Sequence, residues 1–170
     1  MMTTFLLKME TLRLWSYNST SSSGKYVYMT NITAPNNGEI FIVKATGKAE
    51  GITLPFTNIK FHVVKQNPHK LFSLQFTKNE IWHTVSASKN GVTAYKDAPT
   101  WFRVLELYSP NRPYVVFESS EKNEDGDKLY LSSDGSGDMK LKVWNKSVRE
   151  PPRTTGEVDP ALLFRVIAGP

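Results

Sequence analysis

The chain has 170 residues, 21 basic and 16 acidic side chains, a formal net charge of +5 and no cysteine. A chain of this length can bury enough surface to fold as one domain without covalent or metal cross-links. The lack of cysteine excludes disulfides, thiol nucleophiles and zinc–thiolate sites. The apolar runs are far shorter than the roughly 18 residues that span a bilayer, so we expect no membrane insertion.

The first segment of the chain resembles neither a strand nor a secretory signal. Residues 1–11 contain only one short apolar run, Phe5–Leu7, before Lys8. A signal peptide needs an apolar region of about 7–15 residues after a basic start. We therefore expect a short flexible leader over residues 1–11, a single domain over residues 12–170, and synthesis in the cytoplasm without a signal peptide.

Short segments rich in Val, Ile, Phe, Tyr, Trp and Thr follow, separated by clusters of Gly, Pro, Asn, Asp and Ser. Helical periodicity is nearly absent, so the prediction is an all-β domain. Residues 19–24 and 145–160 are rich in turn formers and are predicted to be surface loops. In chain order, the twelve predicted strands are Leu12–Asn18, Lys25–Asn31, Ile40–Ala45, Ile59–Lys65, Lys70–Thr77, Ile81–Ser88, Val92–Asp97, Phe102–Tyr108, Tyr114–Ser120, Lys128–Ser133, Lys140–Lys146 and Leu163–Ala168.

These strands form three sets of four. The last strand of each set carries Phe, a basic or imidazole side chain, Val and an aliphatic residue, at Phe61–Val64, Phe102–Leu105 and Phe164–Ile167. The Phe and Val of each copy are two positions apart and therefore share one face of the strand. Three copies of a four-strand unit predict a β-trefoil of twelve strands in three pseudo-repeats, with a β-sandwich as the alternative.

Each set also has a polar turn after its second strand. These turns are predicted at Asn36–Gly38, Lys89–Gly91 and Asp134–Gly137. Asn-Gly and Asp-Gly pairs adopt the positive φ angles that tight hairpins require. The segment from Asp134 to Asp138 lacks the further spaced ligands of a calcium loop, so we expect a hairpin turn there.

The residue patterns of common catalytic sites are missing from the chain. It has no Gly-x-Ser-x-Gly elbow, His-Glu-x-x-His helix, Walker loop or Rossmann fingerprint. The carboxylates from Glu118 to Asp127 lie in one short segment, which is typical of a solvated loop and not of a glycosidase pair. His62 and His83 lie on predicted strands in alternating patterns. We therefore expect no enzyme activity, no cofactor and no metal site.

Basic residues gather in two regions. The first comprises Lys60, His62, Lys65, His69 and Lys70. The second is a candidate polyanion patch of Lys140, Lys142, Lys146, Arg149 and Arg153. Such a patch attracts heparan sulfate or another polyanion, although a mild positive surface also serves solubility alone. No RNA-recognition motif or helix-turn-helix pattern accompanies it, so nucleic acid is not an expected partner.

The last third of the chain carries a more specific pattern. It contains, in order, Phe117-Glu118-Ser119-Ser120, Leu129-Tyr130-Leu131-Ser132, Leu141-Lys142-Val143 and Phe164-Arg165-Val166. This series resembles the C-terminal signature of the interleukin-1 family of cytokines, whose members are β-trefoils. The loop at residues 121–128 lacks the Pro-Gly and Pro-x-Trp that several members carry after Phe-Glu-Ser. The subfamily, interleukin-1-like or interleukin-18-like, therefore stays open.

The resemblance implies a secreted ligand that binds an interleukin-1-type receptor with immunoglobulin domains and recruits an accessory receptor to trigger inflammatory or immune signalling. Members often lack a signal peptide and leave the cell by unconventional routes, so we expect the same here, with the protein acting as a monomer. Family topology places contacts on the first strand and its hairpin and around the seventh and eighth strands. The candidate receptor-binding residues are Arg13, Tyr17, Lys25, Lys96, Trp101, Arg103 and Glu106.

Two other classes remain open. One is a glycan-binding trefoil, either growth-factor-like through the polyanion patch or a lectin. Ricin-type lectins repeat Gln-x-Trp, but neither Gln66 nor Gln75 has Trp two positions on, which disfavours the lectin. The other is an intracellular trefoil that bundles cytoskeletal filaments.

Overall fold

The computed structural model describes residues 12–96, 99–107, 114–144 and 158–168. Twelve strands and two short 3-10 helices lie in these ranges, so the all-β prediction is confirmed. The elements are β1 (Leu12–Ser16), β2 (Tyr26–Ala34), β3 (Asn37–Gly47), η1 (Gly51–Thr57), β4 (Ile59–Lys65), β5 (Leu71–Lys78), β6 (Ile81–Ser88), β7 (Gly91–Tyr95), β8 (Phe102–Leu107), β9 (Tyr114–Lys122), β10 (Lys128–Ser133), β11 (Met139–Val143), η3 (Pro160–Leu162) and β12 (Phe164–Ala168).

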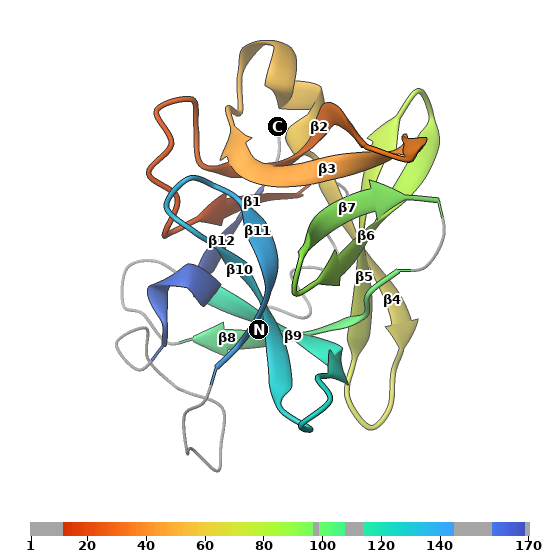
Figure 1. The fold of residues 1–170 in the computed structure, drawn as a ribbon, viewed down its shortest axis with the longest axis vertical. Coiled ribbons are helices and arrows are strands. Elements are labelled where there is room, and N and C mark those ends of the chain that lie inside the picture. The colour runs from red at the N-terminus through yellow and green to blue at the C-terminus, as the bar shows by residue number, and fades with distance from the viewer. Residues whose placement is uncertain (1–11, 97–98, 108–113, 145–157, 169–170) are drawn as a thin grey trace.

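Antiparallel pairing closes the strands into a barrel (Figure 1). Nine strands form the ring β1–β2–β3–β7–β6–β5–β8–β9–β12, and β12 returns to β1 through pairs from Leu12↔Ala168 to Ser16↔Phe164. The pairing Leu12↔Ile59 joins β1 directly to β4. As a result β1, β4, β5, β8, β9 and β12 also complete a smaller circuit, to which the hairpins β2–β3, β6–β7 and β10–β11 are attached.

Aromatic rings from the repeated strands fill the barrel. Phe61, Phe102 and Phe164 point into one core cluster, and the Phe117 ring lies 5.9, 6.1 and 5.8 Å from theirs, centroid to centroid. The Val residues two positions after each repeated Phe contact the same cluster: Val63, Val104 and Val166. The prediction that Phe and Val of each copy share a face is therefore confirmed.

A second apolar cluster covers the outer side of β8, β9 and β10. Its strand residues alternate with those that point into the barrel, because successive side chains face opposite ways. The segment at residues 158–163 lies over them and removes them from water. The members are Leu105, Leu107, Tyr114, Val116, Tyr130, Val158, Leu162 and Leu163, with Trp15 and Trp144 packed against them.

The observed strand bounds match the predicted ones at β4, β6 and β10 and differ by a few residues elsewhere. The largest changes affect β2 and β3, which are longer than predicted. Their turn lies at Pro35–Asn36, between the paired residues Ala34 and Asn37, and not at Asn36–Gly38. Proline favours the second position of a turn because its ring fixes φ near −65°, which explains the shift.

Neither 3-10 helix was predicted from the sequence. The predicted leader at residues 1–11, the strand ends at Asp97, Tyr108 and Lys146, and most of the predicted loop at residues 145–160 lie outside the described residues.

The central ring of the core gives a direct test of this packing. Phe117 is fully buried, so Phe117→Ala is expected to lower the free energy of unfolding by about 3–5 kcal/mol, through lost transfer energy and a cavity. Phe117→Leu keeps much of the volume and is expected to cost less. Urea denaturation of the three proteins measures both values. Equal costs for Ala and Leu would contradict a tightly packed aromatic centre.

Candidate functional site

Two of the predicted contact residues lie together at the end of β1. The Lys25 ammonium donates a hydrogen bond to the backbone oxygen of Tyr17 at 3.0 Å and lies 4.1 Å from the centre of the Trp15 ring. Tyr17 is 47% exposed and packs edge-on against Tyr114, with 5.6 Å between ring centroids. Burial lowers the pKa of Lys25. Tyr17 and Lys25 are therefore held in place at the surface.

A second group lies on the outer side of β8, β9 and β10. Arg103 is directly opposite Glu118 in the register of β8 and β9. The Glu118 carboxylate accepts a hydrogen bond from the Tyr130 hydroxyl at 3.1 Å and lies 3.7 Å from the Lys128 ammonium. Burial and the negative charge of Glu118 raise the pKa of Tyr130, so this hydroxyl stays protonated and donates. Trp101, just before β8, is 39% exposed.

The second apolar cluster joins these two groups. Tyr114, which contacts Tyr17, and Tyr130, which donates to Glu118, both belong to it. Arg103 shares the strand face of Leu105, another member, because side chains alternate along the strand. Trp101 lies just before β8, and its backbone oxygen accepts a hydrogen bond from the Ser120 N–H of β9 at 2.9 Å. We call this surface the β8–β9 face, and its exposed or half-buried members are Tyr17, Lys25, Trp101, Arg103 and Glu118.

The other predicted contact residues lie elsewhere. Arg13 is 4% exposed, and its Nε donates to the Thr57 hydroxyl at 2.8 Å, so its observed role is in packing β1 against η1. Lys96 follows β7 and pairs at 3.8 Å with Glu39 of β3. Glu106 is exposed, and it lies on the opposite side of β8 from Arg103, Leu105 and Leu107.

Four residues of this site, Trp15, Tyr114, Glu118 and Tyr130, were not predicted as contact residues from the sequence. Glu118 and Tyr130 lie within the family-like segments, but nothing in their spacing shows that they pair across β9 and β10. Their contact follows from the register Tyr130↔Glu118.

Only part of the candidate polyanion patch lies in the described segments. Lys146, Arg149 and Arg153 lie outside them. Lys142 donates to the Asp159 carboxylate at 2.5 Å. Lys140 and Lys142 line a depression of about 520 Å³ whose wall also carries Glu121, Glu124 and Asp125. The described portion of the patch therefore has mixed charge.

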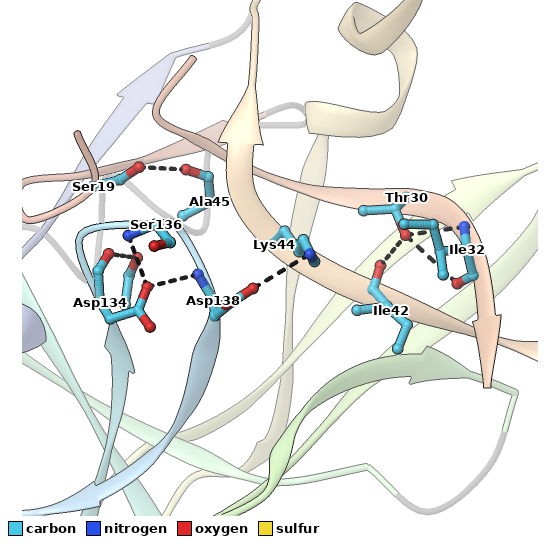
Figure 2. Close-up of polar contacts among 10 residues, drawn as sticks. Ser19, Thr30, Ile32, Ile42, Lys44, Ala45, Asp134, Ser136 and Asp138 are labelled. Carbon is cyan, nitrogen blue, oxygen red and sulfur yellow. Dashed lines mark hydrogen bonds and ion pairs between the residues drawn. The ribbon is translucent and has the colours of Figure 1, made fainter. Parts of the chain in front are cut away.

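The segment from Asp134 to Asp138 folds as the predicted hairpin turn. One carboxylate oxygen of Asp134 accepts hydrogen bonds from the backbone N–H groups of Ser136 and Asp138 at 2.9 and 3.0 Å (Figure 2). The Asp138 carboxylate pairs with Lys44 of β3 at 3.3 Å, which joins the β10–β11 hairpin to the β2–β3 hairpin. Among the residues with described coordinates, no group of three or more acidic or histidine side chains could hold a metal ion.

Comparisons with known proteins do not assign a family. No protein-family model matches the sequence, and no curated protein gives a significant match. None of the helices in the described ranges has the length and hydropathy to cross a bilayer.

Gly137 allows the close approach of the hairpins. Its φ is +84°, and a Cβ there would lie 2.4 Å from the Thr46 side chain and 2.8 Å from the Ala45 carbonyl. Gly137→Ala is therefore expected to lower the free energy of unfolding by about 1–3 kcal/mol. The matched control is Gly135→Ala, whose Cβ would meet only Thr20 at an ordinary 3.6 Å. Thermal unfolding compares them, and similar losses would contradict the role assigned to Gly137.

The Lys142–Asp159 pair predicts a pH dependence. Burial alone raises the pKa of Asp159, but hydrogen bonds from Lys142 and the Ala161 backbone hold it below its usual value. This stabilisation is present above the unfolded pKa near 4 and is lost as the pH falls through the lower folded pKa. Lys142→Met is expected to lower the unfolding free energy by about 0.5–1 kcal/mol at pH 7, because the pair is only partly buried.

Urea denaturation at pH 7 and at pH 3 checks this expectation. The difference between Lys142→Met and the unmodified protein should shrink as Asp159 becomes protonated. The exposed Lys140→Met is the control for loss of a lysine from the same strand. A Lys142→Met effect that stays unchanged at pH 3 would show that the pair does not cause it.

Proposed function

We propose that the protein is a β-trefoil ligand of the interleukin-1 type, which acts by binding a receptor with immunoglobulin domains. The observation that carries the proposal is the circuit of β1, β4, β5, β8, β9 and β12 with three attached hairpins. A trefoil has six barrel strands and three hairpins, and the repeated Phe residues of β4, β8 and β12 meet in one core as its pseudo-symmetry requires.

The family-like segments give further support from their positions. They lie on four consecutive strands, β9 to β12. Their large apolar residues Phe117, Leu131, Leu141 and Phe164 all belong to the barrel core. The resemblance therefore involves residues that specify the barrel, while Glu118 and Tyr130 of the same segments reach its outer side.

The β8–β9 face is the proposed contact with the primary receptor. Protein interfaces of this kind bury roughly 1,200–2,000 Å² and depend on a few aromatic and arginine anchors. Tyr17, Trp101 and Arg103 are residues of these types, and Tyr17 is already held by Tyr114 and Lys25. Side chains that are ordered before binding lose less conformational entropy when the complex forms, which favours affinity. The bound form would then recruit the accessory receptor.

The proposed life cycle follows from the same assignment. The protein is made in the cytoplasm, is released by an unconventional route and acts outside the cell as a monomer. A chain without cysteine needs no oxidising compartment to fold, which fits synthesis in the cytoplasm. Signalling requires only binding, so the proposal assigns no catalytic residue, cofactor or nucleic-acid partner.

Surface plasmon resonance against a panel of interleukin-1-type receptor ectodomains tests the proposal. We expect one receptor to bind, and we expect Tyr17→Ala and Arg103→Ala each to weaken that complex at least about tenfold, as central anchors do. Ile52→Ala and Lys89→Ala are the matched controls, because both residues are exposed and lie outside the β8–β9 face. No binding to any ectodomain at micromolar protein would contradict the proposal that the protein is a receptor ligand. Equal losses of affinity in the control variants would contradict the assignment of the contact to the β8–β9 face.

A further inference from the structure

The stretch of chain that forms three neighbouring strands carries positive charge with almost no acid. The sequence from Ile59 to Ser88, which forms β4, β5 and β6, contains the lysines Lys60, Lys65, Lys70 and Lys78 but only one carboxylate, Glu80. It includes the whole first basic region of the sequence, in which His62 and His69 lie among the lysines. A surface dominated by one sign of charge attracts ligands of the opposite sign.

The strand register shows which of these residues share the outer side. Lys60 is opposite Gln75, which is opposite Thr84, and Thr77 is opposite Trp82. Directly opposed residues in antiparallel strands lie on the same face of the sheet. Ile59, Phe61 and Phe76 alternate with them and belong to the barrel core. The outer surface, which we call the β4–β6 face, therefore presents Lys60, His62, Gln75 and Trp82, with Lys65 at the end of β4.

Trp82 gives this face an apolar platform. Its side chain is 45% exposed, although the fold buries most other large aromatic residues of the barrel. The Lys60 ammonium lies 5.2 Å from the centre of the indole ring. An exposed ring beside a lysine combines a flat, electron-rich surface with a fixed positive charge.

We propose that the β4–β6 face binds a linear sulfated polysaccharide. The weakly positive C–H groups of a sugar ring pack against the negative face of the indole. Sulfate groups pair with Lys60 and Lys65, and the Gln75 amide and His62 ring offer hydrogen bonds to sugar hydroxyls. This site is independent of the receptor proposal, since it shares no residue with the β8–β9 face.

The observations favour a sulfated sugar over single-stranded nucleic acid. Proteins that bind single strands stack successive bases on several aromatic side chains. On the described part of the β4–β6 face, Trp82 is the one residue of the Phe, Tyr and Trp types that is strongly exposed. The β4–β6 face is also more uniformly positive than the depression at Lys140 and Lys142, where carboxylates line the same wall and Asp159 pairs with Lys142.

Isothermal titration with size-defined heparin in 0.15 M NaCl tests the proposal on the full chain. Lys60→Glu with Lys65→Glu is expected to weaken binding at least about tenfold, since the local charge reverses at two exposed contacts. Lys48→Glu with Lys89→Glu makes the same change in net charge at exposed positions elsewhere and is expected to change affinity less than about twofold. Equal losses in the two pairs would overturn the site, because only net charge would then matter.

A Trp82 variant tests the role of the indole ring, and a nucleic-acid probe tests the choice of a polysaccharide as the ligand. Trp82→Ala leaves the charge unchanged and is expected to weaken heparin binding at least about threefold through lost stacking. No effect in a variant whose thermal unfolding is unchanged would overturn the platform. If a thymidine oligonucleotide of similar charge binds more tightly than heparin, the assignment of a polysaccharide ligand is wrong and nucleic acid is favoured.

Further measurements show which surface binds heparin and whether heparin binding is independent of receptor binding. A larger loss from Lys140→Glu with Lys142→Glu than from Lys60→Glu with Lys65→Glu would place polyanion binding on β11 and overturn the assignment to β4–β6. Equal affinity of the protein for desulfated and for fully sulfated heparin would overturn the requirement for sulfate. Receptor binding should survive Lys60→Glu with Lys65→Glu, so failure of either proposal can be recognised without the other.

Discussion

The packing of Phe117 against Phe61, Phe102 and Phe164 is the constraint on which the rest of the structure depends. A small closed barrel has an interior that only side chains can fill, and protein interiors tolerate few voids. Three strands far apart in the chain each supply a Phe to this interior, and β9 supplies the ring between them. The side chains that point inward therefore fix the rotation of each strand, which in turn decides what points outward.

The β8–β9 face follows from that rotation. With Val115 and Phe117 inside the barrel, Tyr114 and Val116 of the same strand must lie outside it, where η3 and the residues before it cover them. The exposed groups at the edge of this cluster are then positioned by apolar contacts. This matters because isolated surface ion pairs such as Lys128–Glu118 contribute little stability by themselves.

The sequence predicted what depends on local pattern and missed what depends on distant contacts. The Phe and Val repeat located the core strands because strand alternation is a local property. Family topology placed Arg13 among the receptor contacts, yet it is buried, with η1 residue Thr57 as its hydrogen-bond partner more than forty positions away. Trp82 and Lys60 come together only through the register of three strands, which no single segment encodes.

The two proposed faces would work by different physics. The proposed anchors of the β8–β9 face are the aromatic residues Tyr17 and Trp101 together with Arg103, and the hydrophobic burial of the two aromatic rings is weakly affected by salt. Lysines dominate the β4–β6 face, where the attraction is screened over about 10 Å at 0.1 M salt. A long-range, salt-sensitive contact suits a ligand that must be retained near a charged matrix, whereas a short-range contact suits selection of one receptor. Because the barrel holds both faces on the outside of one rigid core, a change in charge on one need not alter the geometry of the other.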